Sequence, residues 1–166
     1  MLLTTPRLSL KPMAQRDAPA LLAILSDPEA MRFWQRPPIM RLAVVEEMVR
    51  EQIAAGPLCR YWTVRRGLDP IGSCDLSFIR PEDGQAEVGF LFRRDQWGFG
   101  FAGEAMAAVT AFAFERLSLS LLIARTHVEN SRARRLLERL GFVLDRTENS
   151  GGPGISMPVA IYLLQS

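Results

Sequence analysis

Residues 96–105 read Gln-Trp-Gly-Phe-Gly-Phe-Ala-Gly-Glu-Ala, a glycine-rich turn between a predicted strand and a predicted helix. Such a turn presents unpaired backbone N–H groups at the positive end of the helix dipole, which favours an anion. Gly98 and Gly100 have no Cβ, so they let the backbone approach a phosphate closely. The turn therefore predicts an anion-binding site at the start of the helix.

The same glycines leave two other interpretations open. The spacing Gly98-x-Gly100-x-x-Gly103 fits the dinucleotide-binding pattern, which follows the first strand of a βαβ unit and precedes an acidic residue by about 20 positions. Here most of the chain precedes the turn, and the region near residue 123 has no carboxylate before Glu129. NAD is therefore disfavoured. The plainer alternative is a turn whose glycines serve geometry alone.

The patterns around the turn predict a mixed sheet with helices on both faces. Strands are expected over residues 7–11, 60–66, 71–79, 85–93, 121–127, 142–146 and 158–164. Helices are expected from Asp17 to Asp27-Pro28, over 42–55, over 103–117 and over 130–140. Strands 60–66, 71–79 and 85–93 are joined by turn-forming residues and should form an antiparallel meander. The fold class is α+β with α/β/α layers and a mostly antiparallel central sheet.

The first two helices carry specific expectations. Asp17 is expected to cap the first, whose apolar face is Leu21, Leu22, Ile24 and Leu25. The second should turn one set of side chains inward: Val44, Val45, Met48, Val49 and Ile53.

Length and composition bound the class of protein. A chain of 166 residues suits one domain, expected over residues 1–166, with a sizeable core. No secretory signal or membrane span is predicted, and the cysteines Cys59 and Cys74 are expected as free thiols in a reducing cytoplasm. With His127 the only histidine, no metal site is expected.

The net charge of +2 gives no reason to expect nucleic acid or a membrane as partner. Residues 1–92 carry 11 basic and 11 acidic side chains, whereas residues 93–142 carry 8 and 5. The positive excess therefore lies in the stretch that holds the glycine turn, where arginines are suited to phosphate.

Alternation along the strand 85–93 separates two faces. Val88, Phe90 and Phe92 point one way, and Glu87, Gly89 and Leu91 point the other. One face of this strand therefore brings together a carboxylate, a bare backbone and an apolar side chain.

Three motifs, taken together, resemble the GNAT superfamily of N-acetyltransferases, in the branch of the ribosomal-protein N-terminal alanine acetyltransferases. Residues 4–10, Thr-Thr-Pro-Arg-Leu-Ser-Leu, with Asp17 and residues 27–32, are similar to the N-terminal signature of that branch. Residues 97–102 are similar to the acetyl-CoA motif Q/R-x-x-G-x-G/A, with Trp97 in first place. Residues 130–142 are similar to the motif N-x-x-S-x-R-x-L-E-x-x-G-F.

The resemblance implies an acetyl-CoA site. Backbone amides from Gly98 to Gly103 would hold the pyrophosphate, through Gly98, Phe99, Gly100, Phe101, Ala102 and Gly103. The backbone of Phe92 and Arg93 would pair with the pantetheine arm as an added strand does. Asn130 would hydrogen-bond the pantetheine region. One or more arginines would meet the adenosine phosphates, from the set Arg93, Arg94, Arg132, Arg134 and Arg135.

Acetyl transfer to an amine needs a group that accepts a proton. Glu87 is the expected base, because it shares a strand face with the implied thioester site, and Asp75 on the preceding strand is the reserve. A backbone N–H near Leu91 or Phe92 would polarise the thioester carbonyl.

No general acid can be carried over from the resemblance. The position of the tyrosine that many GNATs use is Leu137, and the serine of N-x-x-S is Ala133. Ser131, His127 and Tyr162 are conceivable substitutes. No cysteine lies near the motif, so direct transfer in a ternary complex is expected.

The acceptor side should be built from Phe33, Trp34, Arg36, the Pro37-Pro38 turn and residues 148–158, with Trp34 expected mainly as a core or interface residue. The expected function is transfer of an acetyl group from acetyl-CoA to a primary amine, either a peptide N-terminus or a small molecule, by a monomer or homodimer. The alternative is an acyl-CoA-binding module without turnover.

Overall fold

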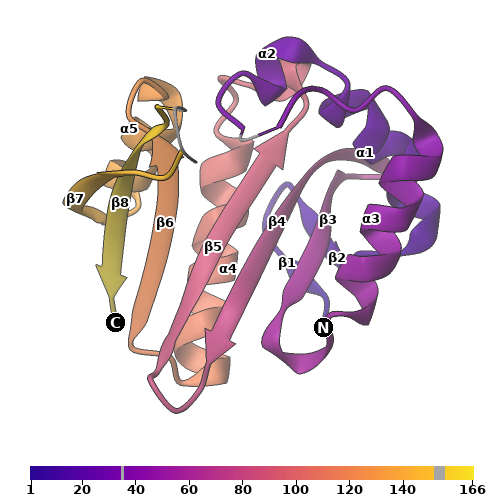
Figure 1. The fold of residues 1–166 in the computed structure, drawn as a ribbon. Helices are drawn as coiled ribbons and strands as arrows, with labels where there is room; N and C mark the ends of the chain where they lie inside the picture. Colours follow the sequence, from indigo (N-terminus) through magenta and orange to yellow (C-terminus); the bar gives the residue numbers. More distant parts are fainter. Residues whose placement is uncertain (35, 152–155) are drawn as a thin grey trace.

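The computed structural model describes residues 1–34, 36–151 and 156–166. One eight-stranded sheet runs through these residues in the order β1-β2-β3-β4-β5-β6-β8-β7, and every neighbouring pair except β5/β6 is antiparallel (Figure 1). The strands are β1 (Leu3–Thr4), β2 (Ser9–Pro12), β3 (Arg60–Arg66), β4 (Asp69–Arg80), β5 (Gln85–Phe92), β6 (Leu121–His127), β7 (Val143–Asn149) and β8 (Pro158–Gln165). The expected α+β class with a mostly antiparallel central sheet is confirmed.

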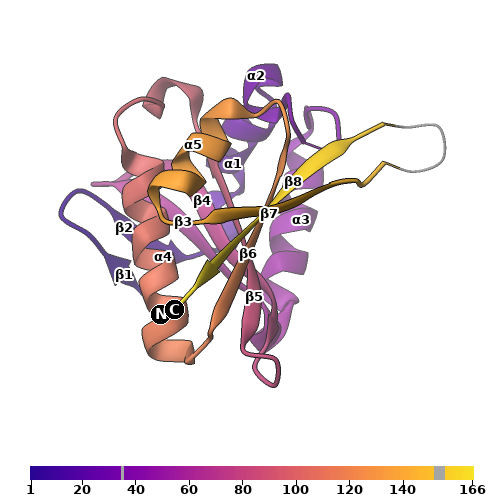
Figure 2. The ribbon, with the colours of Figure 1, turned by 90° about the vertical axis from the view of Figure 1, so that its left-hand side faces the viewer.

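Helices cover both faces of the sheet, as expected. They are α1 (Ala18–Leu25), α2 (Pro28–Met31), α3 (Leu42–Ala54), α4 (Phe101–Leu117) and α5 (Ser131–Arg139), with short 3₁₀ turns at Gln15–Asp17, Gly56–Leu58 and Arg94–Gln96. Figures 1 and 2 show α4 on one face of the sheet and α1 and α3 on the other. None of the helices in the described part of the chain is long and apolar enough to cross a membrane.

Two apolar clusters fill the space between the layers. The larger one packs α4, through side chains such as Met106 and Val109, against sheet residues that include Trp62. The smaller one lies under α1 and α3. Val88 and Phe92 of β5 belong to the first cluster and Leu91 to the second, so the alternation predicted along this strand is confirmed.

The parallel strands β5 and β6 are paired over only half their length. Their register runs from Gln85 opposite Leu121 to Val88 opposite Ala124 and ends there. β6 continues alongside β8 as far as His127, while β5 continues alongside β4 as far as Phe92. The C-terminal halves of the two strands therefore diverge, as Figure 1 shows.

Two details of the first helices differ from expectation. Val44 and Ile53 were predicted to face inward but are 44% and 50% exposed, because α3 buries only the narrow stripe formed by Val45 and Val49. Asp27-Pro28 does not simply end the first helix. Asp27 caps α2, because its carboxylate accepts a hydrogen bond from the Glu29 N–H at 2.9 Å.

Asp17 has a different role from the predicted cap of α1. Its side chain makes no capping hydrogen bond to that helix and is only 2% exposed. Instead Oδ2 accepts hydrogen bonds from the Ala14 N–H at 3.0 Å and the Thr63 hydroxyl at 2.8 Å, and Oδ1 pairs with Arg65. The carboxylate thus ties the start of α1 to β3, which a local pattern cannot reveal.

We predict that Asp17→Ala lowers the free energy of unfolding by about 3 kcal/mol, because it leaves a buried hydroxyl and guanidinium without their acceptor. Urea denaturation measures the change. Asp145→Ala is the matched control, because it removes an exposed ion pair with Arg146 and should cost less than about 1 kcal/mol. Equal effects of the two substitutions would contradict the assignment.

Candidate active site

The glycine turn has the backbone geometry of an anion site. Gly98 and Gly100 have φ values of 85° and 81°, which side-chain-bearing residues rarely adopt. Gly100 is the N-cap of the 17-residue helix α4 and offers no side chain to satisfy the first N–H groups of that helix. Those groups belong to Phe101, Ala102 and Gly103, whereas the Glu104 N–H already donates to the Gly100 carbonyl. An ideal Cβ added to Gly98 or Gly103 would meet no atom within 4 Å, so space is open there.

The turn is held by the N-terminal segment of the chain. Arg7 donates from Nη1 to the Phe99 carbonyl at 3.0 Å and from Nε to the Glu104 carboxylate at 2.6 Å. The Thr5 hydroxyl donates to the same carboxylate. Burial alone would raise the pKa of Glu104, but these hydrogen bonds outweigh it and hold the pKa below its usual range. Thr5 and Arg7, which belong to the N-terminal signature, thus hold the glycine turn in place.

Beyond Val88, the edge of β5 that faces β6 carries backbone groups with no strand partner among the described residues. The Arg93 N–H donates to the Ile71 carbonyl of β4 at 2.9 Å. Because hydrogen-bonding directions alternate along an antiparallel strand, the N–H groups of Phe90 and Phe92 point the other way, toward β6. The Phe92 carbonyl accepts from the Trp97 indole at 2.9 Å. Of the two residues expected to pair with a pantetheine arm, Phe92 presents its N–H at this edge, and Arg93 has its N–H turned toward β4.

The arginines expected near the phosphates differ in their partners. The Arg93 guanidinium is bound by Asp69 and Asp95, and Arg94 pairs with Asp27 at 2.9 Å. Arg134 donates to the Tyr162 hydroxyl and to the Val128 carbonyl. The remaining two, Arg132 and Arg135, are exposed residues of α5.

Helix α5 begins beside the glycine turn. Asn130 caps it, with its side-chain oxygen accepting from the Ala133 N–H at 3.2 Å, which leaves the amide NH₂ group as a donor. Arg132 stacks on the Trp97 ring at 4.2 Å from its centroid. The starts of α4 and α5 therefore lie together at one edge of the sheet, because both helices follow the C-terminal ends of parallel strands.

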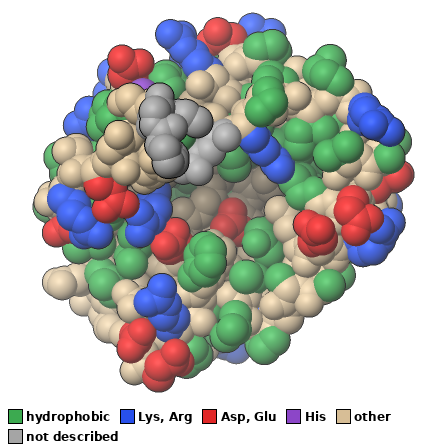
Figure 3. Space-filling model, viewed as in Figure 1, with side chains coloured by type: hydrophobic (Ala, Val, Ile, Leu, Met, Phe, Trp, Pro, Cys, Tyr) green, Lys and Arg blue, Asp and Glu red, His purple; other side chains and the backbone are tan. Residues whose placement is uncertain are grey.

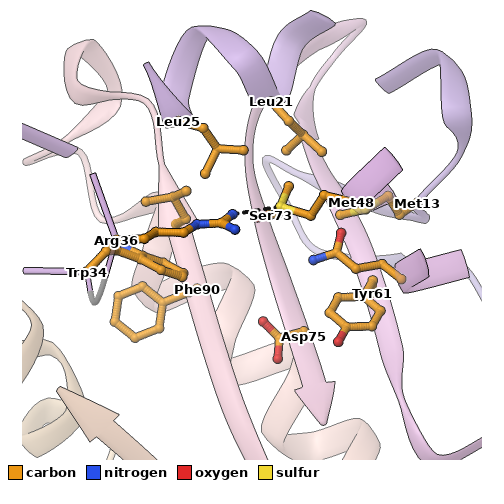
Figure 4. A pocket seen from close by; sticks show the side chains of 12 residues that line it. Met13, Leu21, Leu25, Trp34, Arg36, Met48, Tyr61, Ser73, Asp75 and Phe90 are labelled. Atoms are coloured by element: carbon orange, nitrogen blue, oxygen red, sulfur yellow. Dashed lines mark hydrogen bonds between the residues drawn. The ribbon is translucent and has the colours of Figure 1, made fainter. Parts of the chain in front are cut away.

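A small cavity of about 60 Å³ opens on the face of β5 that carries Glu87, Gly89 and Leu91. Figure 3 shows a hollow in the middle of this face with acidic side chains at its margin. Figure 4 shows Asp75 and Tyr61 on one side of the cavity and Trp34 and Arg36 on another. Its walls are Met13, Leu21, Leu25, Trp34, Arg36, Met48, Gln52, Tyr61, Ser73, Asp75, Phe90 and Leu91. Trp34, expected mainly as a core or interface residue, is 45% exposed and lines the cavity.

Asp75 is the acidic group of this cavity. Burial is the main cause that raises its pKa to about 6, and the charge of Glu87 adds to the effect against the hydrogen bond from Ser77. Burial, followed by negative charge at Cys59 and Asp75, also raises the pKa of Tyr61. Asp75 lies directly against Gly89, where an added Cβ would come within 2.5 Å of Oδ1. The bare backbone on this face thus makes room for the carboxylate.

Glu87 lies one step further along the face, opposite Ser77. It pairs with Arg125 of β6 at 3.3 Å, and Arg125 also pairs with Glu148 of β7 at 2.8 Å. Glu87 is not among the residues that line the cavity. The structure therefore places Asp75, the reserve candidate, on the wall of this cavity and Glu87 outside it.

The three candidates for a general acid lie in different surroundings. The Tyr162 side chain is fully buried, and its hydroxyl donates to Glu138 at 3.0 Å and accepts from Arg134 at 2.9 Å. His127 stacks on Phe33 with ring centroids 5.4 Å apart, and its Nδ1 accepts from the Glu129 N–H. Ser131 is exposed at the start of α5. Of the late loop, residues 152–155 lie outside the described residues.

Sequence reasoning missed Tyr61 and Gln52 as cavity residues. Both lie on elements that the sequence predicted, but only the packing of α3 over the sheet brings them together. The available signal was the register of the meander, which places Tyr61 opposite Asp75 and Asp75 opposite Gly89.

Comparisons with known proteins agree with this geometry. A family model described as an acetyltransferase (GNAT) domain matches residues 7–143. The chain is 31% identical over 144 residues to the uncharacterized N-acetyltransferase p20 of Bacillus licheniformis, which covers 84% of this chain and 81% of that protein.

Solved structures with the same fold include two acetyltransferases with coenzyme A bound. One is RimL, a ribosomal L7/L12 α-N-protein acetyltransferase, with a TM-score of 0.90 at 15% identity and coverage of 99% of this chain and 98% of that one. The other is a spermidine N-acetyltransferase from Vibrio cholerae with coenzyme A and spermine, with a TM-score of 0.85 at 21% identity and coverage of 97% and 96%. The family match and the relative at 31% identity decide the assignment: the chain belongs to the GNAT family of N-acetyltransferases, for which acetyl-CoA is the acyl donor.

Proposed function

We propose that this acetyltransferase binds acetyl-CoA between the glycine turn and the open edge of β5, and passes the acetyl group directly to a primary amine held in the cavity beside Asp75. The observation that carries the proposal is the shared position of these parts. An anion site, a strand edge with free N–H groups and a carboxylate-bearing cavity lie around the point where β5 and β6 diverge.

The residues present fit the donor. The N–H groups of Phe101 to Gly103 and the positive φ values of Gly98 and Gly100 suit a pyrophosphate at the start of α4. The Phe90 and Phe92 N–H groups suit an extended arm that pairs with β5 as an added strand. The amide NH₂ of Asn130 and the guanidinium groups of Arg132 and Arg135 supply further donors.

The reaction needs a neutral amine, because an ammonium nitrogen has no lone pair. The amine nitrogen forms a bond to the thioester carbonyl carbon, the carbon–sulfur bond breaks, and the sulfur leaves as a thiolate that takes a proton from water. The amine proton passes to a protein carboxylate. A thiol with a pKa near 8.5 is a good leaving group, so this route needs no side-chain acid.

Two carboxylates can take the amine proton, and they have different positions. Glu87 is the base expected from the sequence and is held by Arg125. Asp75 lines the cavity, and its pKa of about 6 keeps it ionised at neutral pH while making it a better proton acceptor than an ordinary carboxylate. We therefore assign proton acceptance to Asp75 and give Glu87 a positioning role, through its charge.

A route through an acyl-cysteine has no support in the described residues. Cys74 is fully buried in the larger apolar cluster, and burial raises the pKa of its thiol. Cys59 does not line the cavity. A binding module without turnover is disfavoured because the cavity contains a carboxylate with a pKa suited to proton transfer.

Gly103→Ala tests the donor site. Alanine should stabilise the first turn of α4 by about 0.5–1 kcal/mol, because it replaces a glycine in a helix. Its methyl group projects toward the N-terminus of the helix and should obstruct the pyrophosphate. We expect a higher melting temperature together with at least a tenfold higher dissociation constant for acetyl-CoA by calorimetry. Unchanged affinity in the more stable variant would contradict the site.

The pH dependence of the rate separates the two carboxylates. If Asp75 accepts the proton, kcat/KM expressed per neutral amine rises with pH through about 6 to a plateau, and Asp75→Asn removes this limb and lowers kcat by about 100-fold or more. Glu87→Gln removes a charge that raises the pKa of Asp75, so the limb moves to lower pH and the plateau changes only a few-fold. A 100-fold loss in Glu87→Gln with the limb retained in Asp75→Asn would return the role to Glu87.

Asp75→Asn should raise the stability of the protein although it lowers the activity. The pKa of Asp75 is raised from 3.8 to about 6, so the folded protein loses stability as pH rises across that window. Asp75→Asn should therefore raise the free energy of unfolding by about 2–3 kcal/mol at pH 7.5. The gain should vanish below about pH 3, where aspartic acid is largely neutral in both states. Denaturation of both proteins at the two pH values measures it, and a loss at pH 7.5 would contradict the burial cost.

A further inference from the structure

The cavity beside Asp75 has an apolar part and a polar part, and both restrict the kind of acceptor that it can bind. Its wall is mostly apolar, and the apolar side chains come from α1, α3 and β5: Leu21, Leu25, Met48 and Leu91, with Met13 before α1. Asp75 and Gln52 supply acceptors for hydrogen bonds. Arg36 and Trp34 lie at the exposed side, between α2 and α3.

The size of the cavity limits the group that it can hold. A water molecule needs about 10–15 Å³ of such volume, so the cavity of about 60 Å³ holds on the order of four non-hydrogen atoms. A leucine or methionine side chain has four, so the cavity holds such a side chain, and the amine and carboxylate of the same molecule lie at its margin. A sugar ring is larger, and the long chain of a polyamine would have to extend past Arg36.

Gln52 offers a buried acceptor with no donor. Its Oε1 atom is inaccessible to solvent and receives no hydrogen bond from any described residue. A buried polar atom in this state costs about 1–3 kcal/mol, so an N–H group brought by a ligand would be favoured. The N–H groups of a bound amine, next to Asp75, meet this need.

Arg36 places a positive charge on the same cavity. Within the described residues its guanidinium group donates a hydrogen bond to the Met48 sulfur at 2.8 Å, and sulfur is a weak acceptor. The guanidinium group is therefore available to a stronger acceptor, and its forked donors match the two oxygens of a carboxylate. The same charge repels an acceptor that carries a second ammonium group.

We propose that the acceptor is a free α-amino acid with a short apolar side chain, of the leucine or methionine type. Its amine lies toward Asp75 and Gln52, its carboxylate toward Arg36, and its side chain against Leu21, Leu25 and Met48. This inference rests on the proposed function of the same cavity and narrows its acceptor class. It separates that class from polyamines and from peptide N-termini, whose first residue has an amide in place of the carboxylate.

The test compares acceptors that differ in one group. L-Leucine, L-leucinamide, 3-methylbutylamine, a peptide beginning with leucine, and spermidine are supplied with acetyl-CoA, and release of the coenzyme A thiol is followed. Rates are expressed per neutral amine. We expect kcat/KM for leucine to exceed that for leucinamide and 3-methylbutylamine by about 10–100-fold, the range for a charge-assisted hydrogen bond. Spermidine should be the poorest acceptor.

Variants of Arg36 identify the origin of the preference. Arg36→Ala should lower kcat/KM for leucine by about 10–100-fold and leave leucinamide within about threefold, with KM for acetyl-CoA unchanged, and Arg36→Lys should restore part of the loss. Arg41→Ala is the matched control. Arg41 belongs to the same connection and is exposed, and its side chain makes no capping hydrogen bond and does not line the cavity.

Each other outcome overturns a defined part of the argument. Equal or faster acetylation of leucinamide, the peptide or spermidine by the unmodified enzyme overturns the amino acid assignment and leaves the proposed function standing. A uniform loss for all acceptors in Arg36→Ala also overturns it. Tight binding of acetyl-CoA without thiol release for any amine overturns the proposed function itself.

Discussion

The short pairing between β5 and β6 is the constraint on which the rest of the structure depends. Parallel strands joined through α4 bring their C-terminal ends to one edge, so the glycine turn and the start of α5 become neighbours. β6 keeps β8 as its partner beyond Ala124, while β5 keeps only β4. One edge of β5 is thereby left with backbone groups that no strand satisfies. Such an edge is a liability unless a ligand covers it, and an extended cofactor arm can do so.

Local patterns were sufficient for most of the fold. Turn residues and alternation predicted the meander and the two faces of β5, and the glycines predicted the turn before α4, because these features depend on a few neighbouring residues. The role of Asp17 depends on Thr63 and Arg65, which lie on another element. The exposure of Val44 depends on how much of α3 meets α1. Such facts arise from packing and leave little trace in a single sequence.

The face of β5 that carries Glu87 and Gly89 shows the same difference between local sequence patterns and packing. The sequence placed Glu87 and Gly89 together and ranked Glu87 above Asp75. It could not show the ion pair of Glu87 with Arg125 or the cavity under α1 and α3 that Asp75 lines, because both depend on packing. Gly89 shows how the sequence pattern and the packing are connected. The sequence placed a bare backbone on this face, and in the folded protein the missing side chain accommodates the carboxylate of Asp75. Burial of that carboxylate lowers the stability of the folded protein, and the same burial raises the pKa of Asp75.

The bonds from Thr5 and Arg7 to Glu104 and Phe99 join residues that are 92 to 99 positions apart. During synthesis at about 5–20 residues per second, the connection between β1 and β2, which holds Thr5 and Arg7, must wait on the order of 5–20 s before its partners are synthesised. The contacts of the N-terminal segment with the glycine turn therefore form late in folding. Contacts of such sequence separation slow folding. The glycine turn gains these contacts only at that stage, so a chain that ends before Phe99 cannot form them.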